Sequence, residues 1–255
     1  MHLRRLKIFL AIGYQSLKYR LINRQYVAKP VSVNPVASHH ELSHRSKFLL
    51  VHYVHQFNDA ACSVATVATV LNAIMDMNHG NSHHTISQKE ILNTVRVVDW
   101  KERIMPSGRG TKRGLPLKEL GIAVENTLKT YKISFEKISV THLDHKDLDW
   151  PVERETLLNR LTAFEQSDNQ YMIAHFNQGI FLKGLHLPHI SPVGAFKVNT
   201  KEVLVLDVDK DGPGPYWVPF DVFFKGLSND FNGKLADYGY TGGGYVQFQL
   251  NLPPK

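Results

Sequence analysis

The sequence predicts an α+β fold in which a helical first half carries the only cysteine and a mostly antiparallel sheet forms the second half. Three observations lead to this class. Apolar residues recur at helical spacing up to about Phe164. From Gln170 onward, short alternating segments are separated by loops rich in Gly, Pro, Asn and Asp. A length of 255 residues, with 43% hydrophobic and 21% charged residues, suits one globular body with a sizeable core, which we expect to form two lobes.

Positive charge is concentrated at the N-terminus. Residues 1–48 carry nine basic groups and one acidic group, a balance of +8, whereas residues 49–255 carry 21 basic and 22 acidic groups, a balance of −1. We therefore predict a basic arm and linker over residues 1–47 and a nearly neutral catalytic domain over residues 48–255. The chain contains no nucleic-acid motif and no glycine-rich phosphate loop, so we expect no nucleic-acid partner.

The first 26 residues combine basic groups with the short apolar run Ile8–Tyr14. This run is too short to span a bilayer. Three interpretations stay open: an amphipathic helix lying on an anionic membrane surface, a cleaved signal peptide, or a helix that packs on the body or moves freely. We favour a cytoplasmic protein and keep a membrane-associated or exported form as alternatives.

Residues 27–46 are predicted to form a solvated linker. They contain Pro30, Pro35 and a patch rich in His and Ser. No carboxylate or thiolate completes a metal-ligand set around the histidines of this patch, so no metal site is predicted there; these histidines are His39, His40 and His44. Phe48–Val54 is predicted to be a short strand or extended segment.

The segment around Cys62 has the strongest pattern in the first half. Small and apolar residues fill Ala61–Ile74 on nearly every side, which predicts a helix that is buried all round. Asn58 and Asp59 are good N-cap residues, so Cys62 falls in the first turn, where free backbone N–H groups and the helix dipole favour a thiolate. The Gln56 amide can face the same space as an oxyanion donor. The alternative is an inert core cysteine.

The other elements follow from caps and periodicity. A Ser87–Glu90 capping box opens a helix from about Gln88 to Val97, and Pro151 lies at an early position of another. The helix that contains Pro151 is expected to run from Trp150 to about Phe164. One further helix is expected over Leu117–Tyr131, with a loop over Met105–Pro116. Strands are expected over Ile133–Ile138, Tyr171–Phe176, His189–Val198, Val203–Val208 and Gly244–Leu250.

The strand-rich half places a histidine and a carboxylate where they can meet. His189 begins one predicted strand and Asp207 ends the next, beyond a tight turn. In a hairpin, the start of one strand lies beside the end of its partner. An imidazole held by a carboxylate can accept a proton from a thiol and return one to a leaving amine. The order Cys62, His189, Asp207 is the papain-like one, although each of the last two residues could also be structural.

These motifs resemble the phytochelatin synthase family (glutathione γ-glutamylcysteinyltransferase), in its short bacterial form with a papain-like cysteine protease fold. The resemblance covers roughly residues 48–250. It depends on Gln56, on Cys62 with Val64–Thr66 and Val70–Ala73, on His189–Gly194, on Leu206–Val208, and on Pro213–Pro219. The chain departs from the family pattern at Ala61 and Ser63, where the family has Tyr and Gly, and at Lys210, where it has Arg.

The resemblance implies a reaction on glutathione. Cys62 would attack the carbonyl between cysteine and glycine, His189 would protonate the departing glycine, and Asp207 would orient His189. Gln56 and the Cys62 N–H would stabilise the oxyanion. The resemblance also suggests substrate contacts at Ser191, Lys210 and Trp217.

The γ-glutamylcysteinyl thioester would then pass to water or to a second glutathione. The first step needs no cofactor. In the transfer step, cadmium or zinc could enter as a glutathione thiolate. A homodimer stays open. Two other classes of protein also stay open: a different papain-like thiol peptidase, such as a bacteriocin-leader peptidase, and a non-catalytic relative that binds glutathione or a peptide.

Overall fold

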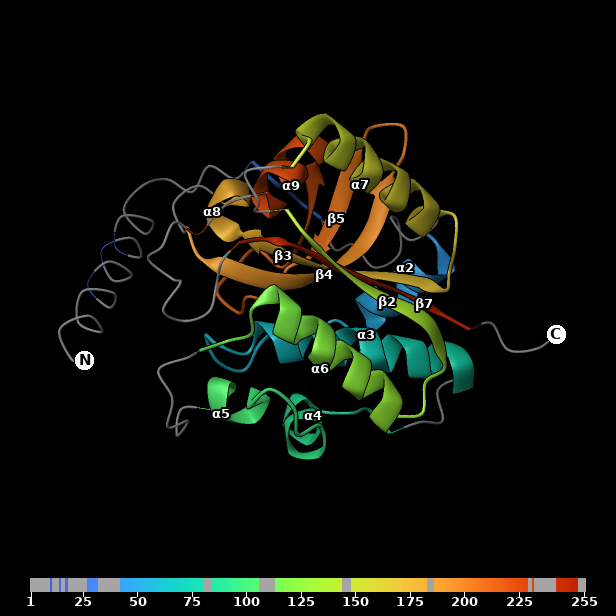
Figure 1. Ribbon diagram of the computed structural model, residues 1–255. Coiled ribbons are helices and arrows are strands. Elements are labelled where there is room, and N and C mark those ends of the chain that lie inside the picture. Colours follow the sequence, from blue (N-terminus) through green and yellow to red (C-terminus); the bar gives the residue numbers. More distant parts are fainter. Residues whose placement is uncertain are drawn as a thin grey trace.

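The structure is a computed structural model and describes residues 10, 14, 17, 27–31, 42–79, 84–105, 113–143, 148–182, 186–228, 231 and 242–251. Within these residues, a seven-stranded sheet has helices on both faces (Figure 1). The strand order is β1-β6-β5-β4-β3-β7-β2, and every neighbouring pair is antiparallel. This architecture confirms the predicted α+β class.

The strands occupy mainly the second half of the chain. They are β1 (Lys29–Pro30), β2 (Phe135–His142), β3 (Gln170–Asn177), β4 (Pro188–Lys197), β5 (Glu202–Leu206), β6 (Pro215–Pro219) and β7 (Gly244–Leu250). The five strands predicted in the region after Tyr131 correspond to β2, β3, β4, β5 and β7. Strand β6 was not predicted because it begins and ends with proline, which is tolerated only near the edge of a sheet. Beyond it lies only the two-residue strand β1.

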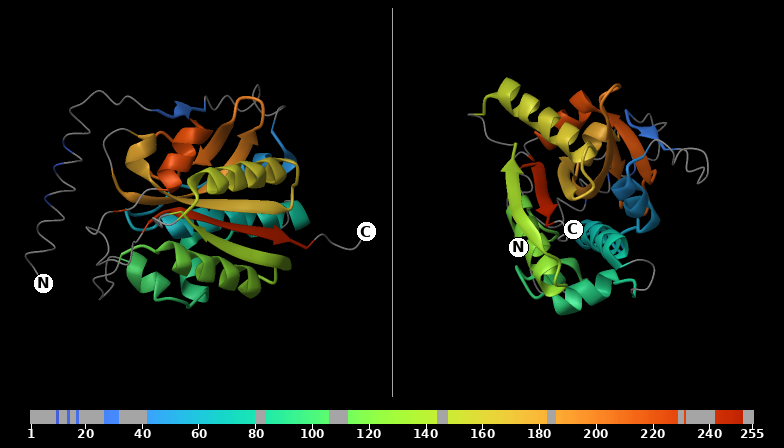
Figure 2. Two further views of the ribbon diagram at one scale, coloured as in Figure 1. Left: turned by 45° about the horizontal axis from the view of Figure 1, so that its top comes forward. Right: turned by 90° about the vertical axis from the view of Figure 1, so that its right-hand side faces the viewer.

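Helices form a layer on each face of the sheet, and both views in Figure 2 keep this arrangement. One layer contains α3 (Cys62–His79), α4 (Gln88–Thr94), α5 (Trp100–Ile104) and α6 (Leu117–Thr130), and the other contains α7 (Trp150–Glu165), α8 (Gln178–Phe181) and α9 (Phe220–Leu227). Side chains of β3 alternate between the two layers: Tyr171 and Ile173 pack with α3, whereas Met172 and Phe176 pack on the other face.

Four predicted helices are present, counting α3. Helix α4 begins after Ser87, whose Oγ accepts a hydrogen bond from the Glu90 backbone N–H at 3.2 Å, as the capping box predicts. Asp149 caps α7 in the same way through the Val152 N–H, at 3.3 Å. Helices α5, α8 and α9 were not predicted, because five, four and eight residues show too few turns for a helical period.

Helix α3 is the centre of the fold. Every residue from Ala61 to Ile74 is buried, as the apolar pattern predicts. The residue directly before the helix is Ala61 rather than Asn58 or Asp59. Asn58 instead organises the preceding turn, where its Oδ1 accepts from the Ala60 N–H at 2.8 Å and its carbonyl oxygen accepts from the Ala61 N–H.

The prediction for the segment before α3 is wrong. Residues expected to form a solvated linker and then a strand form helix α2 (His44–Val51), with Ser43 Oγ accepting from the Ser46 N–H. The apolar run Phe48–Val51 is too short for its periodicity to separate a strand from a helix. The deciding signal was the N-cap serine, which lay inside the stretch assigned to the linker.

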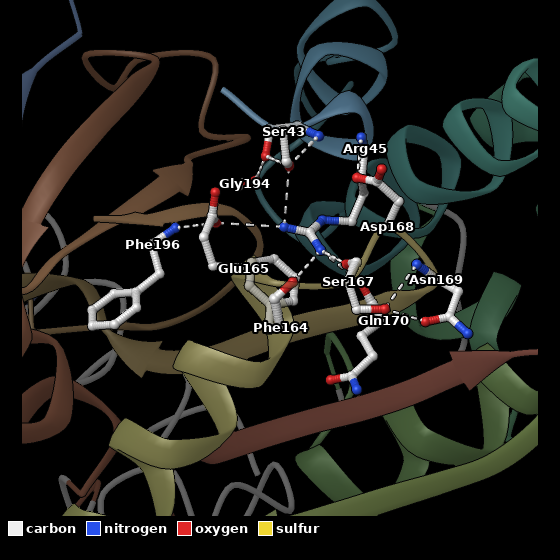
Figure 3. A network of polar contacts seen from close by, with 11 residues as sticks. Ser43, Arg45, Phe164, Glu165, Ser167, Asp168, Asn169, Gln170, Gly194 and Phe196 are labelled. Atoms are coloured by element: carbon white, nitrogen blue, oxygen red, sulfur yellow. Dashed lines mark hydrogen bonds and ion pairs between the residues drawn. The ribbon is translucent and has the colours of Figure 1, made fainter. Parts of the chain in front are cut away.

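Arg45 binds helix α2 to the body (Figure 3). The side chain is fully buried, and its Nη1 donates to the carbonyl oxygens of Phe164, Ser167 and Gln170. Its guanidinium carbon lies 3.5 Å from the Phe164 ring centroid, and its backbone N–H donates to Asp168 Oδ1 at 2.9 Å. Burial lowers the pKa of Arg45 to about 10, so the group stays charged at neutral pH. Carbonyl groups from the α7–β3 connection, together with the Glu165 carboxylate 3.6 Å from Nη2, therefore offset the burial of this charge.

Other parts of residues 1–47 also contact the body. Strand β1 pairs with β6 through Lys29 and Pro30, and the Val27 N–H donates to the Phe181 carbonyl at 3.2 Å. The domain boundary at residue 47 stays a prediction. Leu10, Tyr14 and Leu17 are helical and largely exposed, at 63%, 67% and 58%. None of the described helices is long and apolar enough to cross a membrane.

Candidate active site

The first residue of α3 and the second residue of β4 bring a thiol and an imidazole together. Cys62 is 7% exposed and His189 is 5% exposed. The Cys62 side chain lies close enough to the imidazole to raise the pKa of His189. The Nε2 atom of His189 is engaged by Asp207 at 2.8 Å. Because the imidazole has only two nitrogens, Nδ1 is the one that faces the Cys62 thiol.

Asp207 lies directly after β5, as the predicted hairpin requires. Strands β4 and β5 pair with Val193 opposite Val205, which places His189 and Asp207 at the same end of the hairpin. The carboxylate is fully buried, and its Oδ1 accepts from His189 Nε2 and, at 3.0 Å, from the Asp209 N–H. Thus Asp207 holds the imidazole in one orientation and selects its tautomer.

Each member of this pair favours the charged form of the other. Burial alone would lower the pKa of His189, but the Asp207 carboxylate and, less strongly, the Cys62 side chain outweigh burial and raise it well above its usual range. Burial would raise the pKa of Asp207, but the neighbouring His189 outweighs this and lowers it. An imidazolium beside a thiol favours the thiolate, which is the nucleophilic form.

Gln56 lies beside this pair through its backbone. Its N–H donates to the Val208 carbonyl at 2.8 Å, next to Asp207 in the chain. The side chain is 6% exposed, and its Oε1 has no hydrogen-bond partner among the residues that the structure describes. This oxygen is an acceptor, so it can bind only a donor group of a substrate. An oxyanion hole would use the Nε2 donor of this amide, so the role of Gln56 there stays a prediction.

Two tyrosines complete the surroundings of Asp207, and neither was singled out from the sequence. Tyr216 donates its hydroxyl to Asp207 Oδ2 at 2.7 Å. Tyr53 donates to the backbone carbonyl of Asp207. The signal for Tyr216 was present in Pro213–Pro219. This segment contains Tyr216 and Trp217, and only one of these adjacent side chains can face the Asp207 carboxylate. That choice required strand β6 to be recognised, because alternate residues of a strand face opposite sides.

Ser191 and Trp217 were predicted to contact substrate. Ser191 is fully buried, and its Oγ accepts from the Val208 N–H at 3.5 Å, which ties β4 to the strand end that carries Asp207. Trp217 is half-buried, with Lys197 Nζ lying 4.3 Å from its ring centroid. The contacts of both side chains are structural, and their roles in substrate binding stay predictions.

Lys210, the third predicted substrate contact, lies on the exposed turn after Asp207. Its Nζ is 2.6 Å from Asp211 and 3.8 Å from Asp59. Asp59 lies three residues before Cys62, so this cation links the two segments that border the thiol. Its role in substrate binding also stays a prediction.

Ser63 has a partner that explains one departure from the family pattern. Its buried Oγ accepts a hydrogen bond from Trp100 Nε1 at 2.9 Å, and both residues are almost fully buried. Helix α5 is held against the start of α3 by this contact and by Asn58 Nδ2, which donates to the Ile104 carbonyl at 3.1 Å. The hydroxyl that replaces glycine therefore satisfies a buried indole N–H.

No group of three or more His, Cys, Asp or Glu residues in the described part of the chain could hold a metal ion. His39 and His40 of the predicted linker lie outside that part. His44 packs edge-on against Phe48, with ring centroids 4.8 Å apart.

Three comparisons with known proteins bear on this site. A family model described as Phytochelatin synthase matches residues 36–234. No curated protein sequence matches the chain. Among solved structures, the chain is similar to the Pseudomonas avirulence protein AvrPphB, with 10% sequence identity and a TM-score of 0.36, over 80% of this chain and 100% of that one. A TM-score this low supports no inference about function.

Proposed function

Since the chain belongs to the phytochelatin synthase family, we propose that it is a thiol acyltransferase that removes glycine from glutathione. The observation that carries the proposal is the arrangement at the start of α3. Cys62 lies beside an imidazole that a fully buried carboxylate holds at 2.8 Å. Acyl transfer through a covalent thioester requires a nucleophile with this kind of support.

In the first step, the Cys62 thiolate attacks the carbonyl carbon of the cysteinyl–glycine amide of glutathione. The carbonyl oxygen becomes an oxyanion, which the Gln56 amide and the Cys62 backbone N–H stabilise. The C–N bond then breaks, and His189 donates its Nδ1 proton to the departing glycine amine. The product is a γ-glutamylcysteinyl thioester on Cys62, with His189 left neutral.

In the second step, an acceptor attacks the thioester carbonyl carbon while His189 removes a proton from the acceptor. The C–S bond then breaks, and Cys62 leaves as the thiolate beside the protonated His189. Water as the acceptor releases γ-glutamylcysteine. The amine of a second glutathione forms a longer peptide, and that glutathione can enter as a cadmium or zinc thiolate, with the metal as part of the substrate. The choice depends on whether a second site orders the amine and excludes water.

The test is to incubate the full chain with glutathione, with and without cadmium, and to identify the products by mass spectrometry. We expect free glycine together with γ-glutamylcysteine or a longer γ-glutamyl peptide. Cys62→Ser and His189→Ala should each abolish glycine release, whereas His84→Ala, at a largely exposed histidine, should not change it. Turnover that persists in a clean Cys62→Ser preparation would eliminate the mechanism. Cleavage of peptides but not of glutathione would instead identify a thiol peptidase.

A further inference from the structure

We propose that Thr66 is a positioning residue that sets the approach of Cys62 to His189. The proposal deepens the function proposed above, on which it rests for the roles of these two residues. Thr66 is fully buried in α3 and has no contact with solvent. It is given no direct part in the reaction at the Cys62 thiol. Its effect is exerted through the helix and the strand that it joins.

The hydrogen bond of Thr66 connects the element that carries the nucleophile with the element that carries the base. Thr66 Oγ1 donates to the carbonyl oxygen of Ile190 at 3.0 Å. Thr66 follows Cys62 by four residues, so the two side chains lie on the same face of α3, one turn apart. Ile190 directly follows His189 in β4. The bond is therefore one helical turn and one strand residue away from the reacting pair.

Among the described residues, the Thr66–Ile190 bond and the Cys62–His189 contact are the polar connections between α3 and β4, and the side chains around them are apolar. Ala65, Ala68 and Ile190 belong to one hydrophobic cluster, and apolar packing does not by itself specify the position of a helix along a strand. A displacement of about 1 Å at a reacting centre can cost about a hundredfold in rate. The Thr66–Ile190 bond fixes the position of α3 along β4.

The other two segments of the site have comparable connections. The Gln56 N–H bonds the Val208 carbonyl at 2.8 Å, and the Val208 N–H bonds Ser191 Oγ at 3.5 Å. These bonds tie the oxyanion segment and the Asp207 segment to β4. Thr66 supplies the corresponding connection for α3. All three segments are thereby positioned relative to β4, the strand that carries His189.

A buried threonine elsewhere in the chain gives a matched control. Thr127 in α6 is 1% exposed, and its Oγ1 donates to the Ala123 carbonyl at 2.7 Å, within its own helix. Thr66→Val and Thr127→Val each remove one buried hydroxyl without changing side-chain shape. Only Thr66→Val breaks a bond between the two elements of the site. Thr66→Ser keeps the hydroxyl and should restore the bond.

The experiment measures alkylation of Cys62 by iodoacetamide as a function of pH, and glycine release in parallel. At about pH 5.5 only a thiolate paired with an imidazolium reacts quickly, so Thr66→Val should react about tenfold more slowly than the native chain. Near pH 9, where an ordinary thiol ionises unaided, the rates should agree within about twofold. Glycine release should fall by about 10- to 100-fold, in kcat rather than KM. Thr66→Ser should recover at least a third of the native rates, and Thr127→Val should match the native profile.

A native alkylation profile in folded Thr66→Val would overturn the proposal, as would the same loss in Thr127→Val, because the effect would then be general destabilisation. If Thr66→Val does not fold, Thr66→Ala replaces it. His189→Ala serves as the reference for a broken pair, and a native profile in that variant would overturn both this proposal and the mechanism. If the native chain does not cleave glutathione but Thr66→Val still loses acidic alkylation, the positioning role stands and the substrate is wrong.

Discussion

Asp207→Asn tests whether the charge of the buried carboxylate, rather than its shape, supports catalysis. Asparagine has nearly the same volume, and its Oδ1 can still accept from His189 Nε2 and from the Asp209 N–H. Its Nδ2 would replace the oxygen that now accepts from Tyr216, and a phenolic oxygen can accept as well as donate. The substitution therefore removes one charge with little change in packing or hydrogen bonding.

The size of the effect follows from the geometry of the pair. The two groups are joined at 2.8 Å and the carboxylate is fully buried. Unit charges about 4 Å apart at an effective dielectric constant of about 20 interact by about 4 kcal/mol. Removing that interaction weakens protonation of His189 by up to about 10³-fold, since about 1.4 kcal/mol corresponds to a factor of ten. The imidazolium needed to protonate the leaving glycine then becomes scarce at alkaline pH.

The assay is kcat/KM for glycine release across the pH range. The alkaline limb of the profile should move to lower pH, and activity near pH 8 should fall by about 10²–10³-fold. Asp209→Asn is the matched control, because that carboxylate lies on the same turn but accepts from Gln178 Nε2 at 2.9 Å and from the Asp211 N–H, and does not contact His189. An unshifted alkaline limb in folded Asp207→Asn would refute the argument that this charge sustains the imidazolium.

Three further predictions concern the oxyanion, the pH dependence of stability and the arm. Gln56→Ala should slow acylation by about 10²–10³-fold without preventing alkylation of Cys62, and a loss smaller than severalfold would make Gln56 a packing residue. Burial lowers the pKa of His175 to about 3. Between about pH 6.5 and pH 3, His175 therefore binds a proton in the unfolded chain but not in the folded chain. The free energy of unfolding should then fall on acidification from pH 6.5 toward pH 3, by up to about 1.4 kcal/mol per pH unit, and urea titrations at several pH values should show a weaker acid dependence in His175→Gln; an equal slope in both proteins would contradict this. We propose that the arm contacts anionic membranes, so deleting residues 1–26 should weaken sedimentation with anionic vesicles at low salt, with each basic group contributing about 1 kcal/mol, and leave glycine release unchanged. A native chain that stays in the supernatant at low salt would exclude membrane binding.

The sequence alone determined the parts of the site whose residue types and local patterns are distinctive. Cys62 could be placed in the first turn of a buried helix because small apolar residues continue on every side to Ile74. His189 and Asp207 could be brought together because two alternating segments and a tight turn specify a hairpin. Local sequence also specified the capped helices α4 and α7. In each of these cases, the deciding interaction lies within a few residues or within one hairpin, where a sequence pattern reports it directly.

Tertiary structure decided what depends on distant partners. Arg45 looks like a linker cation in the sequence, and its burial depends on the carbonyl groups of the α7–β3 connection and on the Glu165 carboxylate. Tyr216 contacts Asp207 only because β6, flanked by prolines, joins the sheet beside β5. The Thr66–Ile190 bond joins residues 124 positions apart. A hydrogen bond between segments that are remote in the chain leaves no period or spacing in the sequence, because its two ends are brought together by the packing of the whole core.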